Sequence, residues 1–270
     1  MKVSPKKSLG QHFLINPRIL DKIVTAAEIS KEDTILEVGP GIGNLTEKLA
    51  EKAGWVIAVE KDRRLIEELR KKFKNKNVEI IEGDVLNQSA AEKAIAFIGA
   101  NYKIVGNIPY YITSNLLRTI FDPRSRTSSN SVRYGARKWP RPKLIVLTIQ
   151  KEVAQRITAK PPKMNLLAVS VQFFSEPKIV SYVSKENFRP RPKVDSAIIR
   201  LKPRGKLPID DAEKLFKLVR AGFSQKRKQL KNNLNKILGP KTIEVLIKAG
   251  INPESRAEEL TVSDWLRICA

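Results

Sequence analysis

The first half of the chain alternates short apolar runs with segments whose apolar residues recur at helical spacing. The runs, rich in Ile, Leu and Val, lie at 34–38, 55–59, 78–81, 103–105 and 144–149. Runs of this length predict strands, and the unbroken apolar character of the last one is typical of a strand buried on both faces. After the second run, the spacing of Leu65, Leu69 and Phe73 predicts a helix. Strands that alternate with helices predict an α/β fold whose parallel sheet is covered on both faces.

The rest of the chain extends this pattern and then leaves it. Residues 16–28 predict a helix, with Pro17 in its first turn. Two further β-rich runs lie at 167–174 and 194–201. Beyond about residue 205 the pattern is helical to the end. We therefore predict an α/β domain over residues 1–205 and a small helical domain over residues 206–270.

The charge of the chain is far from neutral. Lys and Arg number 51 against 28 Asp and Glu, which gives a net charge of +23 and a pI near 10.1. Residues 123–151 and 214–241 hold many of these cations and no acidic residue. Such clusters predict binding to phosphate groups of a nucleic acid rather than a merely solvated surface. The stretch 124–142, rich in Arg, Ser and Pro, has no periodicity and predicts a surface loop.

The scarcity of cysteine and histidine excludes several kinds of site. Cys269 is the one cysteine, so neither an internal disulfide nor a cysteine-based metal site can form. His12 is the one histidine, which excludes multi-histidine metal sites. We therefore expect no metal ion. No apolar run follows the basic residues 1–7, and no stretch is apolar enough to span a bilayer, so we expect a cytoplasmic protein without a signal peptide or membrane segment.

A glycine-rich segment, Glu37–Thr46, follows the first predicted strand and opens a helix. Glycine allows the backbone to turn sharply there and to approach a ligand closely. The dinucleotide-binding pattern requires a third glycine where this chain has Asn44, so the segment is typical of a nucleotide loop but not of a dinucleotide one. A glycine-rich turn by itself is equally compatible with a purely structural role.

Acidic residues follow the next two strands. Glu60 ends the second strand, about 20 residues after the glycines, where a carboxylate can accept hydrogen bonds from the hydroxyls of an adenosine ribose. Gly83-Asp84 follows the third strand, and Asp84 could bind the exocyclic amine of the same adenine. Taken alone, Glu60 would be a solvated carboxylate and Gly83-Asp84 an ordinary turn.

The fourth strand ends in Asn107-Ile108-Pro109-Tyr110. The amino group of an aromatic ring is a poor nucleophile because its lone pair is delocalised into the ring. The side-chain oxygen of Asn107 and the carbonyl of Ile108 could hold the hydrogens of such an amine and free the lone pair. Tyr110 offers a surface on which a flipped-out base can stack. Alternatively, the segment is a strand-to-loop transition with a packed tyrosine.

These motifs together resemble the ribosomal RNA adenine dimethyltransferase family, whose members modify two adjacent adenosines near the 3′ end of small-subunit rRNA. Asn107–Tyr110 is similar to the Asn-Leu-Pro-Tyr signature of adenine-N6 RNA methyltransferases. Other similar segments, in the same order as in the family, are residues 11–14, 37–46, 150–156, 187–197 and 223–234. The resemblance implies a Rossmann-like S-adenosylmethionine-dependent methyltransferase sheet with a small C-terminal helical domain. It also implies N6,N6-dimethylation of small-subunit rRNA by a monomer.

The resemblance implies a role for each matching residue. Those expected to bind S-adenosylmethionine are His12, Leu14, Gly39, Gly41, Glu60, Asp84 and Asn107. Asn107 and Tyr110 would hold the target adenine, and Phe188 would stack on its other face. Phe188 stands between polar residues and beside prolines and cations, so a core position explains it less easily than a stacking one. The residues expected to contact RNA are Lys226, Arg227, Lys228, Lys231, Arg189 and Arg191.

The chain departs from the family pattern at three places. Residues 124–142 look like an insertion, Leu166-Leu167 stands where Tyr-Gly is usual, and Ile108 replaces the commoner Leu. Three other functions are alternatives. A macrolide-resistance methyltransferase of large-subunit rRNA shares the catalytic motifs, and a non-catalytic nucleic-acid-binding factor can share the fold. An NAD-dependent oxidoreductase is disfavoured by Asn44 in the glycine loop.

Overall fold

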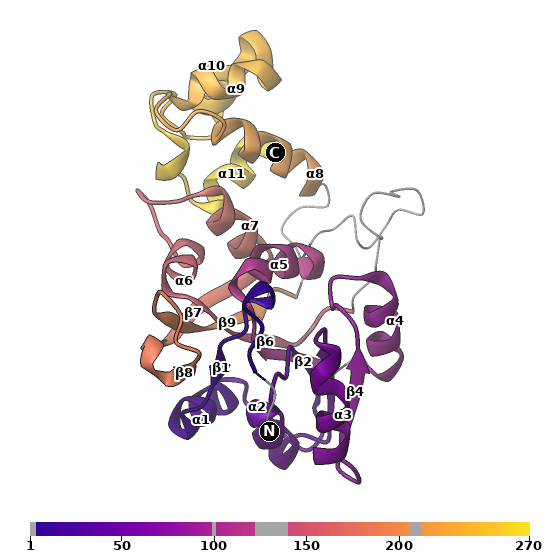
Figure 1. Cartoon of the computed structure of the whole chain (residues 1–270). Helices are drawn as coiled ribbons and strands as arrows, with labels where there is room; N and C mark the ends of the chain where they lie inside the picture. Colours follow the sequence, from indigo (N-terminus) through magenta and orange to yellow (C-terminus); the bar gives the residue numbers. More distant parts are fainter. Residues whose placement is uncertain (1–3, 99–100, 122–139, 206–211) are drawn as a thin grey trace. The chain divides into compact units, whose positions relative to one another are not determined.

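The computed structural model describes residues 4–98, 101–121, 140–205 and 212–270 (Figure 1). The chain forms two compact units. The first contains residues 1–154 and 178–203, and the second contains residues 155–177 and 204–270. The second unit thus combines residues 204–270 with residues 155–177, which lie within the range expected for the first domain. Residues 124–139 of the basic stretch and residues 206–211 at the start of the expected helical domain lie outside the described ranges.

A seven-stranded sheet forms the centre of the first unit, in the order β4-β3-β2-β5-β6-β9-β7. Its strands are β2 (Thr34–Val38), β3 (Trp55–Glu60), β4 (Val78–Glu82), β5 (Tyr102–Asn107), β6 (Leu144–Gln150), β7 (Ser175–Val183) and β9 (Ser196–Pro203). The strands from β4 to β6 are parallel, and β9 runs antiparallel to β6. β2 has β3 on one side and β5 on the other, so the strand order reverses there. Open α/β sheets bind ligands at the carboxyl ends of the strands at such a reversal.

Helices cover this sheet through their apolar sides. Those that precede or follow its parallel strands are α1 (Pro17–Ala26), α2 (Asn44–Lys52), α3 (Arg63–Lys72), α4 (Gln88–Phe97), α5 (Thr113–Phe121) and α6 (Lys151–Ile157). Val56 packs in one core cluster with α1 and α2, and Ala58 in another with α3. Residues two apart on a strand point to the same face, so α1, α2 and α3 cover one face of the sheet.

The expected helix at 16–28 is confirmed as α1. Asn16 caps it by accepting a hydrogen bond from the N–H of Arg18, and Pro17 occupies its first turn, where a missing N–H costs nothing. The five expected strands of the parallel sheet are confirmed, as is the later strand, β9.

The strand expected at 167–174 is wrong, because these residues form helix α7 (Leu166–Phe174). The run is apolar on nearly every position, and such a run does not distinguish a strand from a buried helix. Asn165 settles the choice locally, because its side chain accepts from the N–H of Ala168 and caps the helix. The strand β7 begins immediately afterwards, at Ser175.

The C-terminal part of the second unit is helical, as expected. Its helices are α8 (Ala212–Gly222), α9 (Leu230–Leu238), α10 (Thr242–Lys248) and α11 (Val262–Cys269). Trp265 of α11 is fully buried, and a Cβ added at Gly222 of α8 would lie 2.3 Å from Cη2 of its indole. Gly222 therefore permits the close approach of these two helices.

Short elements complete the fold. The two-residue strands β1 (Phe13–Leu14) and β8 (Phe188–Arg189) form an antiparallel pair. The 3₁₀ turns are η1 (Lys7–Leu9), η2 (Tyr110–Ile112), η4 (Lys185–Asn187), η5 (Gly239–Lys241) and η6 (Ala257–Glu259). The β1–β8 pair holds the N-terminal segment beside the connection between β7 and β9.

Candidate active site

A pocket opens at the carboxyl ends of the parallel strands, within the first unit. Its walls come from residues 9–14, the glycine loop, the ends of β3 and β4, and residues 107–112. The residues expected to bind the cofactor or the adenine all line it: His12, Leu14, Gly39, Gly41, Glu60, Asp84, Asn107, Tyr110 and Phe188. The structure thus brings these residues together in one concave site, although His12 and Phe188 are 176 positions apart in the sequence.

The glycine loop needs its glycines. Gly41 has a φ of +59°, in the left-handed region that other residues rarely adopt. A Cβ at this position would lie 2.9 Å from the ring of Phe13, so the N-terminal segment could not pack over the loop as it does. The main-chain N–H of Gly41 donates a hydrogen bond of 3.0 Å to Oε2 of Glu60. The loop and the second strand end are therefore fixed to each other.

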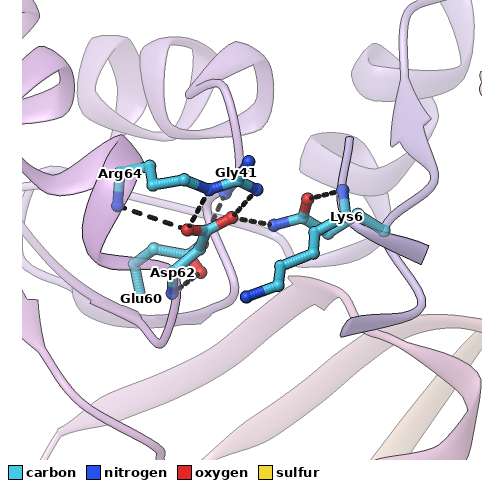
Figure 2. A network of polar contacts seen from close by, with 6 residues as sticks. Lys6, Gly41, Glu60, Asp62 and Arg64 are labelled. Atoms are coloured by element: carbon cyan, nitrogen blue, oxygen red, sulfur yellow. Dashed lines mark hydrogen bonds and ion pairs between the residues drawn. The ribbon is translucent and has the colours of Figure 1, made fainter. Parts of the chain in front are cut away.

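Glu60 belongs to a polar network that ties the glycine loop to the N-terminal segment (Figure 2). Its Oε1 accepts from the N–H of Asp62 at 2.8 Å. Asp62 in turn accepts from the side chains of Arg64 and Gln11, at 2.7 Å and 2.8 Å. The hydrogen bonds from Arg64 are the main cause that lowers the pKa of Asp62 to about 2. Burial raises the pKa of Glu60, and the backbone donors around it oppose that effect.

Glu37 is a buried carboxyl group that the sequence reasoning left without a role. Its side chain is 1% exposed at the pocket wall, and its Oε2 has no hydrogen-bond partner among the described residues. Burial raises the pKa of Glu37 to about 8. A buried polar atom without a partner is costly, so this oxygen is poised to accept from a donor group that enters the pocket. Its place at the start of the glycine-rich segment was the signal available in the sequence.

Asp84 lies at the pocket beside a cation. Its Oδ2 forms an ion pair of 2.9 Å with Nζ of Lys61, and its Oδ1 accepts from the N–H of Leu86 at 2.9 Å. The bond to Leu86 fixes the turn after β4. Among the described residues, the partner of the other oxygen is the half-exposed Lys61, so a ligand amine could replace it.

The Asn107–Tyr110 segment places the amide of Asn107 and the ring of Tyr110 at the pocket. Nδ2 of Asn107 donates to the main-chain carbonyl of His12 at 2.9 Å, which leaves its Oδ1 as an acceptor. The hydroxyl of Tyr110 lies 2.7 Å from Oγ of Ser196, and burial raises the pKa of this phenol. The rings of Tyr110 and His12 are stacked, with centroids 5.9 Å apart. Nδ1 of His12 is 2.7 Å from the carbonyl of Pro190, which orients the imidazole.

The sequence reasoning on Phe188 was wrong in one respect. Phe188 is fully buried and packs in the same core cluster as Leu14 and helix α1. The pairing of β8 with β1 explains this, because it places Phe188 opposite Leu14. The polar residues on either side of Phe188 in the sequence therefore do not indicate whether its side chain points to solvent or to the core. Phe188 also lines the pocket, so its expected contact with a base stays a prediction.

The residues expected to contact RNA fall in both units. In the first, Arg189 and Arg191 are exposed, and Arg191 pairs with Glu186 at 2.7 Å. In the second, Lys226, Arg227 and Lys228 are exposed between α8 and α9, and form no ion pair with the described residues. Lys231 pairs with Glu254 at 3.2 Å.

The described part of the chain contains neither a candidate metal site nor a candidate membrane-spanning helix. There, no group of three His, Cys, Asp or Glu side chains lies close enough together to hold a metal ion. No helix in these ranges is both long and apolar enough to cross a bilayer.

Comparison with known proteins identifies the family. Residues 3–270 match the family model described as ribosomal RNA adenine dimethylase. The chain is 41% identical, over 98% of its length and 87% of the relative's, to the ribosomal RNA small subunit methyltransferase A of Dehalococcoides mccartyi. It is 40% identical to the protein of the same name from Pelotomaculum thermopropionicum, over 98% of this chain and 90% of the relative.

Solved structures agree with the sequence relatives. A dimethyladenosine transferase from Plasmodium falciparum is similar with a TM-score of 0.79 and 31% identity, covering 95% of this chain and 96% of that one. The 23S rRNA methyltransferase ErmE is similar with a TM-score of 0.74 and 27% identity, covering 95% and 98%. The chain therefore belongs to the ribosomal RNA adenine dimethylase family.

Proposed function

We propose that this protein transfers methyl groups from S-adenosylmethionine to the N6 amino groups of two adjacent adenosines near the 3′ end of small-subunit rRNA, two methyls to each. The observation that carries this proposal is the orientation of Asn107. Its amide nitrogen is engaged by the His12 carbonyl, so its oxygen is the atom left to accept from a ligand amine. Tyr110 is beside it and supplies a ring on which the same base can stack.

The other wall of the pocket fits S-adenosylmethionine. Glu60 accepts from two backbone N–H groups, and a carboxylate has room for further donors such as ribose hydroxyls. Asp84 would accept from the adenine amine, and the unpartnered Oε2 of Glu37 would accept from the ammonium group of the amino-acid end. Gly39 and Gly41 allow the backbone to come close to the ligand.

The donor, when bound, supplies a methyl group already activated on a sulfonium sulfur. The residues of this chain need only place the target nitrogen in line with it, and most of the acceleration is positional. In the first transfer, Oδ1 of Asn107 and the carbonyl of Ile108 would hold the two amino hydrogens and draw the lone pair out of the ring. In the second transfer, the methylated nitrogen would offer its one remaining hydrogen to either acceptor. A carbon–nitrogen bond forms as the carbon–sulfur bond breaks. The methylated nitrogen then carries a positive charge and releases its proton to water, so no strong base is required.

The choice of RNA is supported by the relatives. Those of about 40% identity are named small-subunit methyltransferases, whereas the large-subunit enzyme ErmE is 27% identical. Lys226, Arg227 and Lys228 offer exposed charges for phosphates. We infer a monomer that acts in the cytoplasm on the small ribosomal subunit during its assembly.

The experiment combines purified protein, tritiated S-adenosylmethionine and small ribosomal subunits that lack the modification, with large subunits in parallel. The product is digested to nucleosides, and Asn107→Ala serves as the control. We expect N6,N6-dimethyladenosine from small subunits alone, and none with the variant. Label in large subunits alone would identify the macrolide-resistance activity. No label in either, with donor binding intact, would identify a non-catalytic RNA-binding factor.

A further inference from the structure

An aromatic side chain lies exposed on the strand at the edge of the sheet. Tyr182 of β7 is 53% exposed, and β7 is the last strand in the sheet order (Figure 1). Val180, two positions earlier on the same face, is 40% exposed. A tyrosine whose ring is open to water in this way contributes little to the core, so its ring is available to a partner.

A cation accompanies this ring. Nζ of Lys151 lies 5.2 Å from the centre of the Tyr182 ring, within the range of a cation–π contact. Lys151 is itself exposed, and its main-chain N–H donates to the carbonyl of Asp195 at 3.0 Å. The backbone of Lys151 is therefore fixed while its side chain stays accessible. A flat ring beside an ammonium group matches a nucleotide, which carries a base and a phosphate.

This pair is close to the adenine end of the active site. The residue before Lys151, Gln150, pairs with Ser196 across the β6–β9 ladder. Ser196 in turn contacts the hydroxyl of Tyr110 at 2.7 Å. One strand spacing and one residue separate Ser196 from Lys151, so their Cα atoms lie within about 9 Å of each other. Lys151 and the Tyr182 ring that it contacts are thus linked through Gln150 and Ser196 to Tyr110, the ring expected to hold the target base.

The charge around the pair favours an RNA strand over an apolar protein partner. Exposed cations nearby in the chain are Lys178, Arg189, Arg191 and Lys193. The opposing acids are Glu152, Glu186, which is paired with Arg191, and Asp195, whose Oδ1 accepts from the N–H of Lys185. Together with Lys151, the exposed cations outnumber these three acids. A net positive surface with one exposed ring is the combination that binds single-stranded nucleic acid.

We propose that Tyr182 and Lys151 form a second nucleotide position, where an unpaired base next to the target adenine stacks on the Tyr182 ring and Lys151 binds its phosphate. This inference rests on the proposed function, because it requires an RNA strand whose target base occupies the pocket beside Tyr110. The second position holds the strand while one base is flipped, and it sets the register in which neighbouring adenosines enter the pocket.

The test measures KM for undermodified small subunits, kcat, and the Kd of S-adenosylmethionine. Replacing an aromatic platform by alanine costs roughly 5- to 100-fold in binding, so Tyr182→Ala raises KM by that factor. The donor Kd and the thermal unfolding midpoint stay at wild-type values. Tyr182→Phe keeps the wild-type KM, whereas Tyr182→Leu, which keeps apolar bulk without a flat ring, behaves as alanine does. Val180→Ala, on the same face of β7, is the matched control.

The salt dependence of RNA binding tests the contribution of the Lys151 charge separately. Lys151→Gln lowers the slope of log affinity against log salt by about one, because one phosphate contact is lost. A wild-type protein that forms dimethyladenosine together with a Tyr182→Ala variant of unchanged KM would overturn this inference and leave the proposed function intact. Failure of the wild-type protein to methylate either subunit would overturn the proposed function itself.

Discussion

The main-chain N–H of Gly41 donates a 3.0 Å hydrogen bond to the carboxylate of Glu60, across 19 positions of the chain. This bond joins the turn after β2 to the end of the neighbouring strand β3, where the two parallel strands present their carboxyl ends. The same carboxylate holds the N–H of Asp62, the residue that caps α3. One side chain therefore sets the geometry of the loop, the strand end and the following helix, and so shapes the cofactor wall before any ligand enters.

Substitution of Gly41 by alanine should weaken donor binding. The new Cβ would lie 2.9 Å from the ring of Phe13 at a φ of +59°, so either the loop or the N-terminal segment must move. A strained backbone position costs about 1–3 kcal/mol, which predicts roughly a tenfold rise in the Kd of S-adenosylmethionine by calorimetry. Gly205→Ala, where a Cβ meets nothing within 4 Å, is the control. An unchanged Kd for Gly41→Ala would mean that the loop does not approach the ligand.

The buried carboxyl of Glu37 should make stability depend on pH. Its folded pKa of about 8 is above its ordinary value of 4.5, so the folded protein binds an extra proton between these values. The stabilisation is complete below pH 4.5 and is lost as pH rises towards 8. Glu37→Gln removes this dependence. In urea unfolding, the wild-type protein should lose up to about 1.4 kcal/mol per pH unit relative to the variant over this range. Parallel pH profiles of the two proteins would contradict a buried neutral Glu37.

A methyl group on Gly222 should destabilise the helical unit. Its Cβ would lie 2.3 Å from Cη2 of Trp265, and the indole is fully buried and cannot rotate away without moving its neighbours. Overpacking of this kind costs about 1–3 kcal/mol. Chemical unfolding followed by circular dichroism measures the loss. Donor binding, which uses only the first unit, should be unchanged, and a parallel loss of donor affinity would show that the variant perturbs the whole chain.

The sequence predicted the parts of this site that depend on regular spacing. Strand ends in a parallel sheet meet at one edge, so Gly41, Glu60, Asp84 and Asn107 could be placed together from the order of the strands alone. Two features depend on contacts between distant segments, and sequence spacing does not contain them. One is the burial of Phe188, which follows from its pairing with β1. The other is the bond from Asn107 to His12, which decides the orientation of the amide.

The error at 167–174 has a different physical origin. A helix and a strand that are buried on all sides have the same apolar composition, so the pattern cannot separate them. The deciding information was the capping residue Asn165 and the nine-residue apolar run after it, which is long enough for a helix. Glu37 illustrates a further limit, since a carboxyl beside a glycine loop can face water or the core. Only its 1% exposure shows that it is buried and perturbed.

The exposed cations between α8 and α9 should bind RNA through charge alone. Lys226 and Lys228 are exposed, and among the described residues neither has an ion-pair partner that neutralises it. Each phosphate contact releases counterions, so the double variant Lys226→Ala/Lys228→Ala should weaken binding to small subunits and reduce the salt slope by about two. Lys71→Ala is the control, because Lys71 is paired with Glu67 on α3, outside both basic segments.

A measurement of donor binding distinguishes RNA binding by Lys226 and Lys228 from a role in catalysis. The double variant should keep the wild-type Kd for S-adenosylmethionine, because every residue at that pocket belongs to the first unit. Its kcat at saturating subunits should also be close to the wild-type value, since phosphate contacts position the RNA without touching the reacting nitrogen. A wild-type salt slope would place the phosphate contacts elsewhere, and the cations around Arg189 and Arg191 would then be the residues to replace.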